Sequence, residues 1–326
     1  MMNRRHLIQG GAGAIALTAM GRSMAQTFPS GPVAVVLPLQ VGTASDVAVR
    51  QFAQRMAPKL GAPMVVENVV GAAGLIGLER FSKTKPDGQT LAAFNNSILS
   101  ILPHLQASKI KFDTRKEFLP IIGIANIPTF FGVTKSSPFK NIKEVIAFAK
   151  ANPGKLDYSS GGIGSPQHLA TEMLSAYADI KLTHVPYKGA SQAALGLASG
   201  EVGLMSIALS IAQPFLPSEK VRLIGYCGAK RHPQFADVPT LQEQGVKDYE
   251  YASWIGLFAH KNTSQATLDI LRRHAAVAAS ERELHTQLIS SGMEPWVRTP
   301  DQLKKIVDDE YARWGSVIKI AKIQSE

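Results

Sequence analysis

Two turns of the sequence combine glycine, small polar side chains and the start of a helix, a pattern that suits anion binding. The first, LPLQVGTASD, covers residues 37–46 and follows the apolar run VAVVL. Thr43 and Ser45 are suitable N-cap residues for the helical pattern that follows. Free N–H groups at a helix start, together with the positive end of the helix dipole, favour a carboxylate or a phosphate. The candidate ligand-binding residues here are Gln40, Val41, Gly42, Thr43, Ala44, Ser45 and Asp46.

A second turn, YSSGGIGSPQHLA at residues 158–170, has a similar composition. Pro166 is favoured at the first position of a helix, which makes Ser165 the expected N-cap. A glycine and a hydroxyl cap occur in many strand–helix turns, so neither turn alone defines a site. Two such turns converging on one cleft would hold an anion from both sides. The candidate ligand-binding residues of the second turn are Ser160, Gly161, Gly162, Gly164, Ser165 and His168.

Two shorter polar stretches follow strand-like runs and are weaker candidates for the same cleft. Asn95, Asn96 and Ser97 come after QTLAAF, and Ser206 comes after VGLM. Open α/β sheets bind their ligands at the carboxyl ends of the strands, where these residues are expected. Trp254 interrupts another strand-like run and is compatible with either the core or a cleft wall. Plain structural roles fit each of these residues equally well.

One pair of residues resembles a hydrolytic site. Ser165 and His168 are three residues apart and would share a helix face, as a nucleophile and its base require. However, Ser165 is better explained as a cap, and the chain has no G-x-S-x-G motif. The histidines lack metal-ligand spacing and Cys227 is the only cysteine, so no metal site is expected. The glycines of GAAGLIGLE are wrongly spaced for a dinucleotide-binding motif and favour packing or a turn, so no cofactor is expected.

Strand-like runs and helical patterns alternate along nearly the whole chain. The expected strands are residues 32–39, 63–69, 89–95, 118–134, 155–159, 182–187, 202–207, 221–227 and 251–259. The expected helices are residues 46–60, 141–151, 167–178, 191–199, 265–279 and 300–320. Short turns between them favour an α/β fold with mostly parallel or mixed sheets covered by helices.

The apolar run at residues 118–134 is long for one strand and is expected to pass between two sheets. The run VRLIGYCGAK, at residues 221–230, is expected to be the return crossing. This predicts one domain built from residues 26–126 and 225–326 and a second from residues 127–224. Two crossing strands would act as a hinge, and the cleft between the domains is the default place for a small ligand.

Residues 1–25 have the composition of an export signal, with a basic start, a short apolar run and a small-residue ending. Arg4 and Arg5 fit a twin-arginine signal, although Sec signals also contain such pairs. The chain has 35 Lys and Arg against 25 Asp and Glu, and loss of the three arginines of that segment lowers the formal net charge from +10 to +7. The basic residues are scattered singly, which argues against nucleic acid as a partner. We expect a monomeric periplasmic protein without an internal disulfide.

Further motifs extend the pattern of the two turns along the mature chain. They are P-x-x-x-G-x-x-x-D at Pro38, Gly42 and Asp46, then VVENVVGAAGLIG, KPDGQTL, AKANPGKLDYSSGGIGSPQHLA, HVPYKGASQAALGLASGEV, AKRHPQFADVPTLQEQG and ASWIGLFA. In this order they resemble the periplasmic solute receptors of tripartite tricarboxylate transporters, the Bug-type receptor family. The resemblance implies a two-domain Venus-flytrap fold, no enzymatic activity, and delivery of a small carboxylate to a membrane permease. It also implies that residues 40–46, residues 160–165 and His168 surround one carboxylate of the ligand.

Two departures from the family pattern bear on the ligand. Gln40 and Val41 are bulkier than the residues usual in the first turn, and they change the pocket wall. Ile207 and Ala208 stand where the family commonly has a polar or acidic residue, which favours an apolar or aromatic carboxylate over an amino acid. Two alternatives remain, a receptor used for sensing rather than transport and a periplasmic hydrolase that uses Ser165 and His168.

Overall fold

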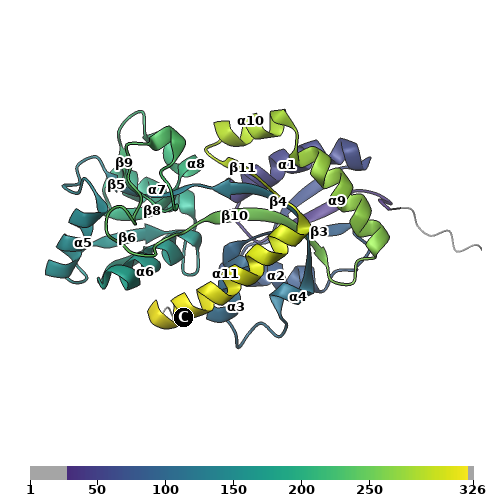
Figure 1. Ribbon diagram of the computed structural model, residues 1–326, viewed down its shortest axis with the longest axis horizontal. Coiled ribbons are helices and arrows are strands. Elements are labelled where there is room, and N and C mark those ends of the chain that lie inside the picture. The colour runs from purple at the N-terminus through teal and green to yellow at the C-terminus, as the bar shows by residue number, and fades with distance from the viewer. Residues whose placement is uncertain (1–27, 322–326) are drawn as a thin grey trace, which may run out of the picture.

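The computed structural model describes residues 28–321, and the export signal predicted at residues 1–25 lies outside them. The described chain forms two mixed sheets, each flanked by helices, on opposite sides of the view in Figure 1. The six-stranded sheet contains β1 (Val33–Leu37), β2 (Met64–Asn68), β3 (Thr90–Asn95), β4 (Phe118–Ile127), β10 (Ser253–His260) and β11 (Glu294–Arg298). The five-stranded sheet contains β5 (Thr129–Thr134), β6 (Asp157–Ser160), β7 (Thr183–Pro186), β8 (Leu204–Ala208) and β9 (Val221–Tyr226). The predicted α/β fold is confirmed.

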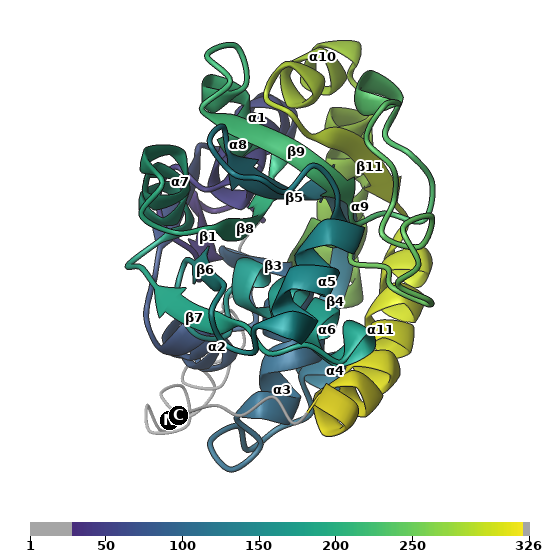
Figure 2. The ribbon, with the colours of Figure 1, turned by 90° about the vertical axis from the view of Figure 1, so that its left-hand side faces the viewer.

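The helices lie between and around these strands (Figures 1 and 2). The half with six strands carries α1 (Ala44–Leu60), α2 (Leu75–Ser82), α3 (Leu102–Leu105), α4 (Thr114–Glu117), α9 (Gln265–Ala279), α10 (Arg282–Ser290) and α11 (Pro300–Ala321). The half with five strands carries α5 (Ile142–Ala151), α6 (Pro166–Ala178), α7 (Ala190–Ser199) and α8 (Leu209–Ala212). Short 3-10 turns at Ala72–Gly74, Gln213–Phe215 and Pro233–Phe235 and a π-helical turn at Ser97–Ile101 complete the set.

The two sheets have related topologies. The strand order is β11-β4-β10-β3-β1-β2 in the larger sheet and β7-β6-β8-β5-β9 in the smaller. In each sheet three strands are parallel, namely β1, β2 and β3, or β6, β7 and β8, and the remaining pairs are antiparallel. The parallel strands end at the same edge of their sheet, so the turns before α1 and α6 both leave from carboxyl ends.

Both faces of the larger sheet are covered, which explains why β1 is a continuous apolar run. Successive side chains of a strand point to opposite faces. Val35 packs in one cluster with Phe52 of α1 and Leu271 of α9, whereas Val36 packs in another with Leu78 of α2.

The chain crosses between the sheets where the long apolar run predicted it. Only one residue separates the end of β4 from the start of β5. The predicted return crossing is wrong, because β9 pairs with β5 along its length inside the smaller sheet. Tyr249 and Tyr251 still pack in the core of that half, and the chain returns with β10. Residues 225 and 226, and the segment that continues from them to Tyr251, therefore lie with the half with five strands, not with the half to which the prediction assigned them.

The last helix, α11, joins the two halves on the outside of the molecule (Figure 1). Leu303 and Val307 pack on the larger sheet in the cluster that contains Leu78. Trp314 and Val317, further along the same helix, pack in a cluster with Leu169 of α6. The helices α2, α3, α4, α8 and α10 and the strand β11 were not predicted from the sequence.

Candidate functional site

A cavity of about 280 Å³ lies between the two halves, at the carboxyl ends of the central strands. Among the described residues that line it, none carries a charged side chain. From the half with six strands it is lined by Pro38, Leu39, Gln40, Thr43, Ala44, Ser45, Val70, Gly71, Ala73, Gly74, Asn95, Ser97, Ile98, Ile127 and Ser253. From the half with five strands it is lined by Thr129, Gly161, Gly162, Ile163, Gly164, Ser165, Pro166, Gln167, Gly189, Ala190, Ser206, Ala208 and Ile211.

The turn before α1 is braced from behind by Asp46. Its side chain accepts hydrogen bonds from the main-chain N–H of Gly42 at 3.0 Å, from Arg50 at 3.0 Å and from Asn68 at 2.9 Å. Burial alone would raise the pKa of Asp46, but these hydrogen bonds and the charge of Arg50 outweigh it and leave the pKa lowered. Asp46 therefore stays ionised and holds the turn, and it does not line the cavity.

Two residues of this turn that line the cavity have main-chain N–H groups without partners in the described part of the chain. Thr43 caps α1 by accepting from the N–H of Asp46 at 3.3 Å, so the helix begins at Ala44. As the first two helical residues, Ala44 and Ser45 have no carbonyl one turn earlier to bond. Both line the cavity, and within residues 28–321 their N–H groups have no partner. The positive end of the α1 dipole adds to their attraction for an anion.

The turn before α6 is braced by three aromatic rings, of which Tyr158 and His168 are buried and His184 is half-buried. Ser165 caps the helix by accepting from the N–H of His168 at 3.4 Å. Nδ1 of His168 accepts from the N–H of Gly164 at 3.3 Å, and the Ser160 hydroxyl lies 2.6 Å from Nε2 of His184. The two imidazole rings are 4.5 Å apart, and the ring of Tyr158 stacks on that of His184 at 4.9 Å. This stack fixes the glycine loop from its inner side.

The acceptor role of His168 requires a neutral ring, and burial provides it. Burial lowers the pKa of His168 to about 4, because the charged form loses its hydration. At neutral pH Nδ1 can therefore accept from Gly164. The main-chain N–H groups of Gly161, Ile163 and Gln167 remain without partners in the described part of the chain, and all three residues line the cavity.

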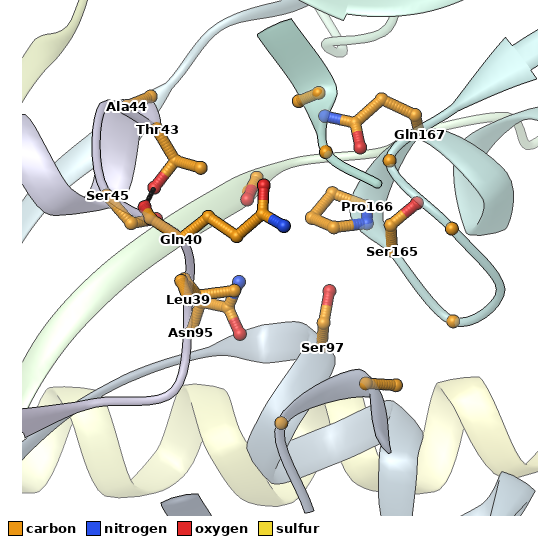
Figure 3. Close-up of a pocket in the computed structure, with 18 of the residues that line it drawn as sticks. Leu39, Gln40, Thr43, Ala44, Ser45, Asn95, Ser97, Ser165, Pro166 and Gln167 are labelled. Carbon is orange, nitrogen blue, oxygen red and sulfur yellow. Dashed lines mark hydrogen bonds between the residues drawn. The ribbon is translucent and has the colours of Figure 1, made fainter. Parts of the chain in front are cut away.

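Polar side chains from both halves also face the cavity without partners (Figure 3). The Asn95 amide is oriented by its Oδ1, which accepts from the N–H of Ile98 at 3.0 Å, so Nδ2 remains as a buried donor with no partner among residues 28–321. Oγ of Ser206, from β8, is likewise buried and unpartnered there. A buried polar atom without a partner is costly, so a ligand that accepts hydrogen bonds here would be stabilised.

The two halves touch across the mouth of the cavity. Nε2 of Gln40 donates to the main-chain carbonyl of Lys188, in the other half. Gly164 lies against Ala73, and a Cβ atom at Gly164 would be only 2.9 Å from the Ala73 methyl group. Gly164 also has a φ of 76°, a left-handed conformation that glycine adopts without strain.

The sequence-predicted residues divide into two groups. Ten line the cavity, namely Gln40, Thr43, Ala44, Ser45, Asn95, Gly161, Gly162, Gly164, Ser165 and Ser206. Six do not, namely Val41, Gly42, Asp46, Asn96, Ser160 and His168. Val41 is 70% exposed and points away, and the Asn96 amide donates instead to the Ala252 carbonyl at 2.7 Å. Gly42, Asp46, Ser160 and His168 brace the turns from behind.

Several lining residues were missed. The apolar wall includes Leu39, Val70, Ile98, Ile163 and Ile211, which come from five separate segments. Ser253 enters from the start of β10. The sequence offered a signal for two of these residues, because Leu39 and Ile163 lie inside the two turns that were predicted to bind the ligand.

The geometry does not form the hydrolytic pair. The Ser165 hydroxyl receives the main-chain N–H of His168, and Nδ1 of the His168 ring is turned to Gly164. No hydrogen bond joins the hydroxyl to the ring in the described chain. Trp254 is core, 1% exposed and stacked on Trp296. Within residues 28–321 there is no cluster of metal-ligating side chains, and no helix is long and apolar enough to cross a membrane.

Comparison with known proteins identifies the family. A family model described as the tripartite tricarboxylate transporter family receptor matches residues 48–323. The UPF0065 protein in the gbd 5′ region of Cupriavidus necator is 33% identical over 99% of this chain and 100% of its own. The structure of Rhodopseudomonas palustris Rpa4515 with adipate is 31% identical, covers 91% of this chain and 99% of that chain, and superposes with a TM-score of 0.84.

A second structure from the same organism, MatC with bound malate, is 28% identical and covers 89% of this chain and 100% of that chain, with a TM-score of 0.83. These likenesses extend over both halves of the fold and the turns between which the cavity lies. The family consists of periplasmic solute receptors, not enzymes. The chain therefore belongs to the receptor family of the tripartite tricarboxylate transporters.

Proposed function

We propose that this receptor binds a small organic carboxylate in the cavity and delivers it to a membrane permease of the tripartite tricarboxylate type. The observation that carries the proposal is the convergence of two helix N-termini, α1 and α6, on one uncharged cavity. Their unpartnered N–H groups belong to Ala44 and Ser45 on one side and to Gly161, Ile163 and Gln167 on the other.

A carboxylate fits these donors better than a neutral group does. It accepts several hydrogen bonds at once, and charge-assisted hydrogen bonds are about twice as strong as neutral ones. Asn95 Nδ2 and Ser206 Oγ would serve further acceptor atoms of the ligand. The apolar wall favours a hydrocarbon chain or ring beside the carboxylate. The relatives with bound adipate and malate carry ligands of this class.

The proposal includes hinged domains. The larger-sheet half and the smaller-sheet half would open and close about the β4–β5 crossing and the segment that leads into β10. Closure would bring the two turns together on the ligand. We place the mature receptor in the periplasm as a monomer, after export through the signal at residues 1–25.

A thermal-shift screen tests the proposal. Adipate, malate, hexanoate, benzoate and citrate are compared with adipamide, the neutral diamide of adipate. An acid at 100 times its Kd stabilises the folded receptor by about 2.7 kcal/mol, which raises Tm by about 5 °C in a chain of this size. At least one acid should produce this shift and adipamide should not. Equal shifts with adipamide, or none with any acid, would contradict the proposal.

A further inference from the structure

The side chain of Gln40 extends from the turn before α1 across the cavity (Figure 3). Its hydrogen bond to Lys188 reaches the turn before α7 in the other half. We propose that Gln40 is a latch that holds the two halves closed over the ligand. This inference rests on the proposed function, because the latch is useful only if the cavity opens and closes around a solute. It concerns a residue and a contact rather than the two anion-binding turns.

The Gln40 backbone is held in place on its own side. Its carbonyl accepts from the Thr43 hydroxyl at 2.9 Å and from the Thr43 N–H at 3.4 Å. With the backbone fixed, the side chain has a defined starting point from which to reach the other half. Its Nε2 then donates to the carbonyl of Lys188.

The other half leaves room for the Gln40 amide at Gly189. A Cβ atom there would lie 2.9 Å from Cδ of Gln40 and still closer to its Oε1. The φ of Gly189 is 176°, an extended conformation that any residue adopts. The glycine is therefore needed for space and not for backbone geometry. An alanine at position 189 would displace the Gln40 amide without straining its own backbone.

Gln40 lies at the solvent side of the cavity and is itself exposed. A hydrogen bond in contact with water contributes little on balance, so the latch is weak and reversible. Such a contact shifts the ratio of closed to open receptor by about 2- to 10-fold. That is enough to change how long a ligand stays bound without trapping it.

Spin labels on engineered cysteines can measure this ratio directly. Val65 and Leu195 are 49% and 59% exposed, one in each half, and the natural Cys227 is buried and will not be labelled. Double electron–electron resonance then separates closed from open receptor, both without ligand and with 10 mM adipate. The variants are Gln40→Ala, Gln40→Glu, which removes the donor at similar size, Gly189→Ala, and the Gln40→Ala and Gly189→Ala pair.

We expect each single change to lower the closed-to-open ratio by about 2- to 10-fold, and the pair to lower it no further than Gln40→Ala alone. Lys188→Ala is the matched control, since its main-chain carbonyl is the acceptor and its exposed side chain is not used. An unchanged ratio in Gln40→Ala, additive effects in the pair, or a wild-type receptor with no closed form in either condition would overturn the latch. If neither adipate nor any other acid of the thermal-shift screen changes the distances or Tm, that failure counts against the proposed function, and the ligand-free ratios still decide the latch.

Discussion

The turn before α1 and the turn before α6 both end in a hydroxyl N-cap, yet the groups behind them differ in kind. Asp46 holds the first turn through an ion pair with Arg50, whose side chain is 46% exposed. His168, whose ring is kept neutral by burial, and His184 hold the second through rings packed against Tyr158. The main-chain donors of the first turn are thus supported by an ion pair near the surface, and those of the second by a largely buried stack of aromatic rings. The two sides should respond differently to mutation and to pH.

The largest effect is expected from His168→Ala. It removes the acceptor for the Gly164 N–H and leaves a cavity beside His184, because His168 is 7% exposed. We expect the free energy of unfolding to fall by about 3 kcal/mol and the affinity for the carboxylate to fall at least 10-fold. Urea unfolding and calorimetric titration measure the two quantities. His285→Ala, on α10 away from the cavity, is the control, and an affinity like that of this control would show that the ring does not shape the loop.

As the pH is lowered, the turn before α6 should lose stability at a higher pH than the turn before α1. The pKa of His168 is lowered to about 4 in the folded state, against about 6.5 in an unfolded chain. Between these values the unfolded chain binds a proton that the folded one does not, so the free energy of unfolding falls as the pH decreases from about 6.5 to about 4, by up to about 3 kcal/mol.

For Asp46, whose pKa is lowered in the folded state, the free energy of unfolding falls only when the pH drops below the ordinary pKa of 3.8 and the carboxylate becomes protonated. Urea unfolding of the wild type and of His168→Gln from pH 4 to pH 7 isolates the contribution of His168, because that of Asp46 begins below this range. The variant should lack the slope between about pH 6.5 and pH 4 that His168 supplies. Equal slopes in both proteins would mean that His168 does not titrate in this way.

A smaller effect is expected from Asp46→Ala. It should lower the free energy of unfolding by about 2 kcal/mol, because the charge-assisted hydrogen bonds to Gly42 and Arg50 are lost. Asp46→Asn keeps an acceptor for Gly42 without the charge and should lie between this variant and the wild type. The loss measured for Asp46→Ala should shrink in 1 M NaCl, since the Arg50 partner is partly exposed to screening. The loss measured for His168→Ala should not depend on salt. If it does, the contrast between the ion pair behind the first turn and the aromatic rings behind the second is wrong.

The smallest effects should come from the caps, and here the two turns should behave alike. Thr43→Ala and Ser165→Ala each remove one helix cap, and each should lower the free energy of unfolding by about 1 kcal/mol. The caps lie in different halves, so the double variant should show the sum of the two losses. A binding loss from Ser165→Ala many times that from Thr43→Ala would show that the hydroxyl does more than cap the helix.

The parts of the site that depend on local sequence were predictable. Gly42 and Thr43 specify a turn and a cap wherever a strand precedes them, and Ser165 with Pro166 does the same. The caps observed are Thr43 and Ser165, whereas Ser45, the other candidate in the first turn, is the second residue of α1. Resemblance to the family then placed the two turns on opposite sides of one cleft.

The rest depends on packing between distant segments. Ser253 reaches the cavity because β10 pairs with both β3 and β4, a sheet order that no local pattern encodes. The return crossing was misplaced for the same reason, since the apolar run of β9 would fit a strand of either sheet, and it is in fact the edge strand of the smaller one. Gln40 was predicted as a wall residue, and its contact with Lys188 joins positions 148 residues apart.

The donor at the start of α1 gives the most direct test of the central claim that main-chain N–H groups of the two turns hold the carboxylate. Ala44 is the first residue of α1, a position where proline is tolerated, and Thr43 before it is extended with a ψ of 159°, as a residue preceding proline should be. Ala44→Pro therefore deletes one N–H and leaves the helix in place, while Ala44→Ser keeps that N–H. In calorimetric titrations with whichever acid gives the largest thermal shift, we expect Ala44→Pro to weaken binding at least 10-fold with an unchanged ligand-free Tm, and Ala44→Ser to bind like the wild type. Wild-type affinity in Ala44→Pro would contradict the account.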